Sequence, residues 1–141
     1  WIIMKQSFYQ IYHNSRCSKS RKALELLKLR TESYKIIRYL EIGIDENVLS
    51  SILNSKNIPK DDLIRKNEIT FRNLNLSKIE LNKNEIKKLI IENSILIQRP
   101  LITKYIDSLL VKSVIGLSPE TVNTLFNYSF VILLLIFGIP I

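Results

Sequence analysis

The stretch that decides the fold is residues 8–21, which reads Phe8-Tyr9-Gln10-Ile11-Tyr12-His13-Asn14-Ser15-Arg16-Cys17-Ser18-Lys19-Ser20-Arg21. Its aromatic and aliphatic beginning predicts a β-strand, its polar middle predicts a tight loop, and its end predicts the first turn of an α-helix. Cys17 is the only cysteine in the 141-residue chain, and it stands where this helix is expected to begin. The stretch therefore places a lone thiol at a helix N-terminus.

Cys17 has the expected surroundings of an activated nucleophile. A thiol attacks as its thiolate, and the ordinary cysteine pKa of about 8.5 leaves little thiolate at neutral pH. The unpaired N–H groups and the positive dipole end of the helix should lower that pKa, and the same N–H groups bind tetrahedral oxyanions. The basic side chains of the stretch add positive potential. Nucleophile and anion site would then coincide.

Neighbouring residues fit this interpretation, but a second one is open. Ser18 and Ser20 are good capping residues that could donate to an anion, and Arg21 lies one helical turn beyond Cys17 on the same side. Alternatively, a single cysteine is commonly an inert, buried small residue. His13 would then be an ordinary strand-end histidine, and the basic residues would form a solvated face. Spacing alone leaves both interpretations open.

Three motifs carry a resemblance to a known family. Residues 11–21 resemble the active-site loop of the glutathione- and glutaredoxin-dependent arsenate reductases of the ArsC family, in which His-Asn-Pro-x-Cys is typical and Ser15 here replaces the proline. Leu-Ile-Arg-Lys-Asn at 63–67 resembles the family's second motif. Leu-Ile-Gln-Arg-Pro-Leu-Ile at 96–102 resembles its third. The resemblance covers about residues 5–125.

The resemblance implies a fold, a reaction and a set of site residues. The fold would be an α/β thioredoxin-like one, with a four-stranded mixed sheet flanked by helices and a cis bond before Pro100. Arsenate would be reduced to arsenite, with glutathione as co-substrate, glutaredoxin as protein partner and no bound cofactor or metal. Cys17 would be the nucleophile, supported by His13, while Arg65 and Arg99 would bind the oxyanion. The loop residues that would surround the substrate are Asn14, Arg16, Ser18, Ser20 and Arg21.

One position departs from the family pattern and keeps other functions open. The family usually has arginine followed by proline where this chain has Leu117-Ser118, so one anion-binding charge is missing, and Lys104 or Lys112 would have to replace it. An alternative is a non-enzymatic, Spx-like thioredoxin-fold regulator that contacts RNA polymerase. The second cysteine of its Cys-x-x-Cys switch is Ser20 here. A further alternative is an orphan thiol reductase acting on glutathionylated or otherwise oxidised thiols.

Composition bounds the class of protein. Hydrophobic residues make up 46% of the chain and charged residues 24%, as in a single globular domain. The formal net charge of +8 is compatible with nucleic acid, an acidic membrane surface or small anions. The lysines around residues 81–91 alternate with glutamates, which is typical of a solvated helix surface, so we expect no nucleic-acid or membrane partner.

The cysteine and histidine counts exclude further classes of site. One cysteine and one histidine exclude an internal disulfide and argue against a metal cluster of these ligands. Residues 1–12 lack the pattern of a signal peptide. A free working thiol suits the cytoplasm, and we expect a cytoplasmic monomer.

The resemblance implies an ArsC-like domain over 4–125, and the almost purely apolar composition after it marks a tail over 126–141. The tail has 16 residues, fewer than the roughly 20 that span a bilayer, and we interpret it as a fragment or reading-frame artefact rather than an anchor. Residues 1–3 precede the only methionine and are interpreted as the leading edge of a fragment. Within the domain we expect strands at 7–12, 34–40, 101–105 and 109–115, helices at 19–30, 46–54, 60–66 and 83–93, a polar connection at 67–81, and a last helix starting at 118–119.

Overall fold

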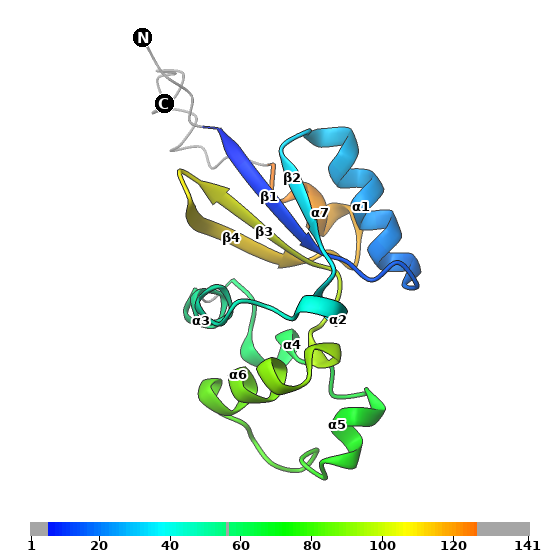
Figure 1. Cartoon of the computed structure of the whole chain (residues 1–141), viewed down its shortest axis with the longest axis vertical. Coiled ribbons are helices and arrows are strands. Elements are labelled where there is room, and N and C mark those ends of the chain that lie inside the picture. The colour runs from blue at the N-terminus through cyan, green and yellow to red at the C-terminus, as the bar shows by residue number, and fades with distance from the viewer. Residues whose placement is uncertain (1–5, 56, 127–141) are drawn as a thin grey trace.

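The computed structural model describes residues 6–55 and 57–126 and contains a four-stranded mixed sheet (Figure 1). The strand order is β2-β1-β3-β4. β1 runs parallel to β2, whereas β3 is antiparallel to both β1 and β4. The strands are β1 (Ser7–Tyr12), β2 (Tyr34–Ile37), β3 (Leu101–Ile106) and β4 (Leu109–Ile115). The mixed sheet confirms the expected fold class.

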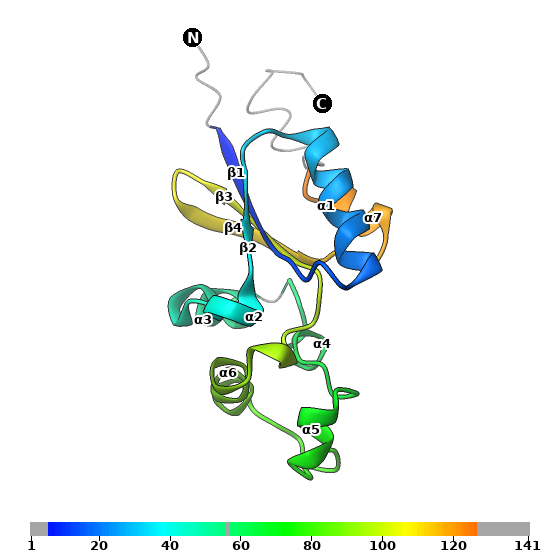
Figure 2. The same cartoon turned by 45° about the vertical axis from the view of Figure 1, so that its right-hand side comes forward.

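Two helices cover one face of this sheet. α1 (Ser18–Arg30) is the crossover that a parallel β1–β2 pair requires, and α7 (Pro119–Asn123) packs beside it (Figures 1 and 2). The core between these helices and the sheet is fully or nearly fully buried and includes Ile11, Leu27 and Val122. This packing fixes where α1 begins, and therefore where Cys17 lies.

A second group of helices gathers beyond one end of the sheet (Figure 2). Its core reaches the strands through Tyr12 and Leu101, and it encloses the fully buried ring of Phe71. Its members are α2 (Tyr39–Ile42), α3 (Glu46–Asn54), α4 (Lys60–Leu63), α5 (Ile69–Asn73), α6 (Lys83–Glu92) and the 3₁₀ turn η1 (Ser94–Leu96). The loop after β1 faces the junction between this group and the sheet.

The strand expected at 34–40 is too long. β2 ends at Ile37, and the chain turns into α2, which buries Tyr39 completely and is followed by the C-cap Gly43 with a φ of 74°. A positive φ suits glycine, which has no Cβ to clash. The Ile- and Tyr-rich sequence of 34–40 did not indicate where the strand ends, because Ile and Tyr fit both a strand and a buried helix face.

The segment 60–81 also differs from expectation. The helix expected at 60–66 ends at Leu63, because Ile64 forms an antiparallel bridge with Ile97. The polar connection expected at 67–81 contains α5, whose buried Phe71 anchors it to the second group of helices. One aromatic residue in a polar stretch was too weak a periodic signal for a helix.

The described chain ends on the sheet rather than away from it. Lys104 and Lys112 donate from Nζ to the backbone oxygens of Leu125 and Thr124, at 2.6 Å and 3.0 Å. Phe126, the first residue of the expected tail, lies with its ring 4.9 Å from that of Tyr9. The rest of that tail and residues 1–5 lie outside the described residues. Within 6–55 and 57–126, no helix is long and apolar enough to cross a membrane.

Candidate active site

The loop between β1 and α1 is a compact turn held by its own backbone. The Asn14 carbonyl accepts the Cys17 N–H at 3.0 Å, and the Asn14 side-chain oxygen accepts the Arg16 N–H at 3.0 Å. Asn14 is 9% exposed, so its side chain serves the loop rather than solvent. Asparagine commonly organises a turn in this way. The turn delivers Cys17 to the N-cap position of α1.

Ser20 ties this loop to the helix. Its hydroxyl is fully buried, accepts the Asn14 N–H at 3.1 Å and pairs with His13 Nδ1 at 2.7 Å. The hydroxyl is therefore engaged inside the loop, away from any anion that the loop binds. Ser18, the first residue of α1, is exposed.

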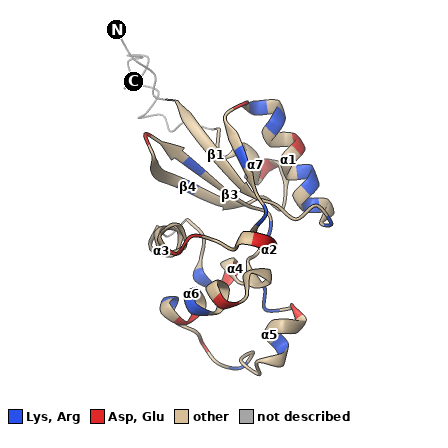
Figure 3. Cartoon of the chain, viewed as in Figure 1, with Lys and Arg blue, Asp and Glu red and all other residues tan. Residues whose placement is uncertain are grey.

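Two loop arginines lie on the outside of the turn. Arg21 donates from its guanidinium to the Ser15 carbonyl at 2.9 Å, which holds the loop against the first turn of α1. Arg16 is exposed and lines a hollow beside the loop. Basic residues also follow α1 along its length (Figure 3). The first turn of α1 contains no acidic residue, so its positive dipole end is not offset locally.

The Cys17 thiol lies in an environment that favours the thiolate. Partial burial acts to raise its pKa, but the backbone N–H groups of Ser20 and Lys19 and the Arg99 guanidinium together outweigh burial and leave the pKa below its ordinary value. The thiol is the one free cysteine and is partly exposed. A partly exposed thiol of lowered pKa is the form in which cysteine acts as a nucleophile.

Arg99 reaches Cys17 from a distant part of the chain. It follows η1 and precedes Pro100, and the Arg99–Pro100 bond is cis, the isomer that the resemblance implies. Burial acts to lower the Arg99 pKa, but the neighbouring Tyr39 hydroxyl and the Cys17 thiol raise it overall. The Tyr39 hydroxyl is fully buried and makes no hydrogen bond of standard geometry within 6–55 and 57–126. Tyr39 was expected to lie in the strand at 34–40 and not at the site.

His13 is held as a neutral ring near neutral pH. Burial is the main cause that lowers its pKa below the usual 6.5, and the charges of Lys28, Arg21 and Arg38 add to it. The Ser20 hydroxyl can donate to Nδ1 while it accepts the Asn14 N–H, which leaves the ring proton on Nε2. His13 therefore contacts the first turn of α1 through Ser20 and brings no positive charge to the loop near neutral pH.

Arg65 occupies a different environment from Arg99. Its N–H donates to the Leu96 carbonyl at 2.7 Å, which places it beside η1. Its guanidinium forms an ion pair with Glu68 at 3.3 Å, with side-chain exposures of 18% and 21%. The nitrogen of that pair is buried and has no hydrogen-bond partner of standard geometry among the described residues. Arg65 thus keeps an unused donor, and its guanidinium is paired with Glu68.

Neither Lys104 nor Lys112 supplies the positive charge that is missing at Leu117. Lys104 and Lys112 both hold backbone oxygens after α7, as described above, so neither provides a cation at position 117. Leu117 is 47% exposed and lines a hollow with Asp61, Asp62 and Gln98.

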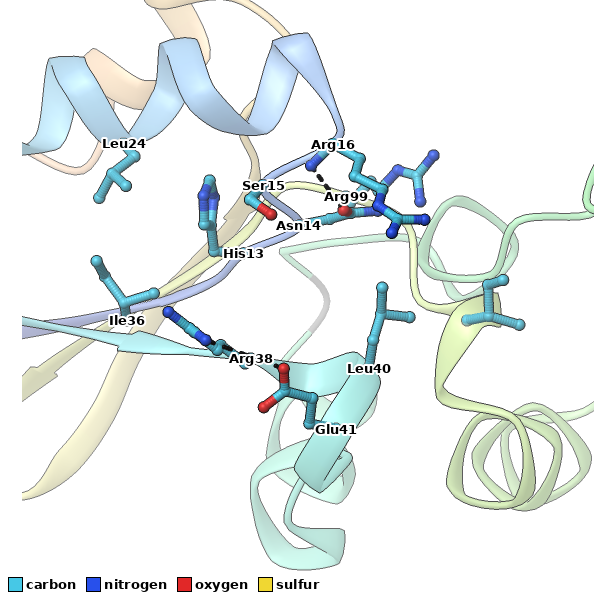
Figure 4. A pocket seen from close by; sticks show the side chains of 11 residues that line it. His13, Asn14, Ser15, Arg16, Leu24, Ile36, Arg38, Leu40, Glu41 and Arg99 are labelled. Carbon is cyan, nitrogen blue, oxygen red and sulfur yellow. Dashed lines mark hydrogen bonds and ion pairs between the residues drawn. The ribbon is translucent and has the colours of Figure 1, made fainter.

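A groove runs beside the loop and is lined by Arg99 (Figure 4). Its volume is about 650 Å³. Arg38 and Leu40 form the opposite side, just after β2, and were not identified from the sequence. The signal was present, because the ends of the parallel strands β1 and β2 meet at one edge of the sheet. The described residues contain no cluster of three side chains suited to hold a metal ion.

The match to known proteins covers this whole arrangement. A model of the family described as "ArsC family" matches residues 12–125. The chain belongs to the ArsC family. An arsenate reductase of Haemophilus influenzae is 37% identical over 115 residues, covering 79% of this chain and 93% of the relative. An uncharacterised Escherichia coli protein, YfgD, is 33% identical over 94 residues, covering 66% and 79%.

Solved structures agree with the ArsC assignment. The structure of an arsenate reductase from Vibrio cholerae superposes with a TM-score of 0.68 at 28% identity, covering 82% of this chain and 95% of that one. A Staphylococcus aureus protein, SACOL0876, gives the same TM-score at 19% identity and supports the fold alone. The thioredoxin-like fold expected from the three motifs is therefore confirmed.

Proposed function

We propose that this chain is an arsenate reductase that works through a Cys17–arsenic adduct. The observation that carries the proposal is the thiol of lowered pKa at the N-terminus of α1, with two backbone N–H groups and the Arg99 guanidinium beside it. Several relatives in the ArsC family bear the name arsenate reductase, the Haemophilus influenzae protein among them. Arginine suits the task because its planar guanidinium offers several fixed donors to an oxyanion.

The first step forms the adduct. The Cys17 thiolate attacks arsenic, a sulfur–arsenic bond forms, an arsenic–oxygen bond breaks, and the leaving hydroxide takes up a proton and departs as water. The N–H groups of Lys19 and Ser20, together with Arg99, hold the arsenate oxygens. Arg65 contributes its unused donor once an anion competes with Glu68. His13 and Arg21 keep the loop in the shape that presents these donors.

The reductant must come from outside the chain, because a single cysteine leaves no resolving thiol. Glutathione attacks the adduct, a second sulfur–arsenic bond forms, and another water leaves. Glutaredoxin then attacks the glutathione sulfur, forms a mixed disulfide and leaves the electron pair on arsenic, which becomes arsenic(III). Water releases arsenite and restores the Cys17 thiolate. We propose this cycle for a cytoplasmic monomer.

The test is an arsenate assay with glutathione and glutaredoxin on the full chain, comparing wild type with Cys17→Ser. Serine also caps helices, so the variant should fold while its turnover falls to background. Arsenate or sulfate should also protect Cys17 from alkylation in the wild type. Unchanged turnover in the serine variant would disprove the assignment. Anion protection without turnover would instead favour an orphan thiol reductase, and the absence of both would favour a regulator.

A further inference from the structure

The groove beside the active-site loop has a charge pattern that arsenate alone does not require. Its cations are Arg16, Arg38 and Arg99, and its acidic member is Glu41. Figure 4 shows Arg38 and Glu41 together on the α2 side, while Arg16 and Arg99 lie together elsewhere along the groove. A tetrahedral oxyanion held at Cys17 needs the second of these groups only. Arg38 and Glu41 are therefore free to contact another part of a bound molecule.

Arg38 and Glu41 are placed to bind a ligand that carries both charges. Their closest approach is 4.0 Å, and their side chains are 76% and 68% exposed. An exposed pair at this distance contributes little to stability, so both head groups are available for a ligand. A cation and an anion side by side complement an amino-acid zwitterion, whose carboxylate and ammonium share one carbon. Leu40 and Ile36 add apolar surface for methylene groups.

We propose that this groove binds glutathione, an inference that rests on the proposed function. The α-carboxylate of the γ-glutamyl end contacts Arg38, and its α-ammonium contacts Glu41. The glycyl carboxylate contacts Arg16. The thiol then points to the arsenic held between Cys17 and Arg99, because Arg99 belongs both to the groove and to the thiol's surroundings. The groove adds no chemical step; it selects the thiol that attacks the adduct.

The test measures binding without turnover. The full chain is titrated calorimetrically with S-methylglutathione, which keeps every charge of glutathione but cannot react. Arg38→Glu should weaken binding at least about tenfold, the loss of one charge-assisted contact. The matched control is Arg72→Glu, the same charge change at an exposed position on α5 that does not line the groove. It should change affinity less than about twofold.

A second pair of ligands tests the zwitterion match. The glutaryl analogue of S-methylglutathione lacks only the α-ammonium group. Glu41→Gln should weaken binding of S-methylglutathione but leave binding of the glutaryl analogue nearly unchanged. Equal losses for both ligands would overturn the assignment of Glu41, and equal affinities of the Arg38 and Arg72 variants would overturn the groove as the site.

Kinetics separate this inference from the proposed function. If the chain reduces arsenate, Arg38→Glu should raise the KM for glutathione and leave the KM for arsenate unchanged. An unchanged glutathione KM would overturn the inference while the reductase assignment stands. If the chain does not reduce arsenate but binds S-methylglutathione through Arg38, the groove assignment stands and the proposed function fails.

Discussion

Arg99 and Arg65 were expected to do the same work, and the structure places them in different environments. Arg99 follows η1, meets the Cys17 thiol and lines the groove. Arg65 directly follows Ile64, which pairs with Ile97, and its guanidinium forms an ion pair with Glu68. The difference shows that an arginine in a family motif can form an ion pair with an acidic residue three positions later in the chain. The Arg99 guanidinium interacts with the Cys17 thiol, whereas the Arg65 guanidinium is paired with Glu68.

The largest effect expected from this comparison is that of Arg99→Ala. Removing a charged donor from a developing oxyanion typically costs about 10²–10³-fold in rate, so kcat/KM for arsenate should fall by that order. The Cys17 pKa should rise, because one of the groups that lowers it is lost. Alkylation rate against pH measures the pKa. Arg65→Ala is the matched variant and should leave the Cys17 pKa unchanged. Equal shifts of the Cys17 pKa in the two variants would show that Arg65 and Arg99 act on the thiol alike.

Releasing Arg65 should sharpen the comparison. Glu68→Gln keeps the side-chain shape but removes the ion pair, which is worth about 1 kcal/mol or less when partly exposed. If arsenate must displace Glu68 to reach Arg65, the KM for arsenate should fall by up to about fivefold. Glu92→Gln, an exposed glutamate at the end of α6, is the control. A higher KM in the Glu68 variant would show that Glu68 positions Arg65 for the anion.

The sequence predicted the loop and the sheet well, and the physical reasons are local. The strand at 7–12 and the helix at 46–54 have the predicted bounds, because period-2 and period-3.6 patterns and the Asp45 cap lie within each segment. The thiol at a helix start was also readable, because it depends on adjacent residues. Pairing between distant segments was not, and the bridge at Ile64 is the main example.

The site residues that the sequence did not reveal depend on tertiary packing. Tyr39 and Arg38 come close to the loop only because β2 stops at Ile37 and α2 turns toward η1. Glu68 pairs with Arg65 across three residues that follow the end of the helical turn at Leu63, and the expected helix over 60–66 did not indicate this ion pair. The sequence shows that these residues are present, but the side chains that they contact depend on where β2 and α4 end.

Acid should weaken the loop through His13. The folded-state pKa of His13 lies below the usual 6.5, so the folded protein binds fewer protons than the unfolded chain between these two values. The free energy of unfolding should therefore fall as pH drops from about 6.5, and the loss should be complete below the folded-state pKa. His13→Asn keeps an acceptor for Ser20 but cannot titrate, so urea unfolding should depend less on pH over this window. An unchanged pH dependence would place the titrating group elsewhere.

Tyr39→Phe should have the smallest effect and decides how Arg99 is positioned. The hydroxyl lies beside Arg99 and raises its pKa, yet it makes no hydrogen bond of standard geometry to the part of the chain that the structure describes. A guanidinium stays charged with or without this neighbour, so its charge at Cys17 is unaffected. We therefore expect kcat/KM for arsenate to change by less than about threefold, which corresponds to less than about 1 kcal/mol. The Cys17 pKa should stay the same, since Tyr39 acts on the thiol only through Arg99. A loss approaching that of Arg99→Ala would show that the hydroxyl orients the guanidinium once arsenate is bound, and Arg99 would then share with Arg65 a dependence on one neighbouring side chain.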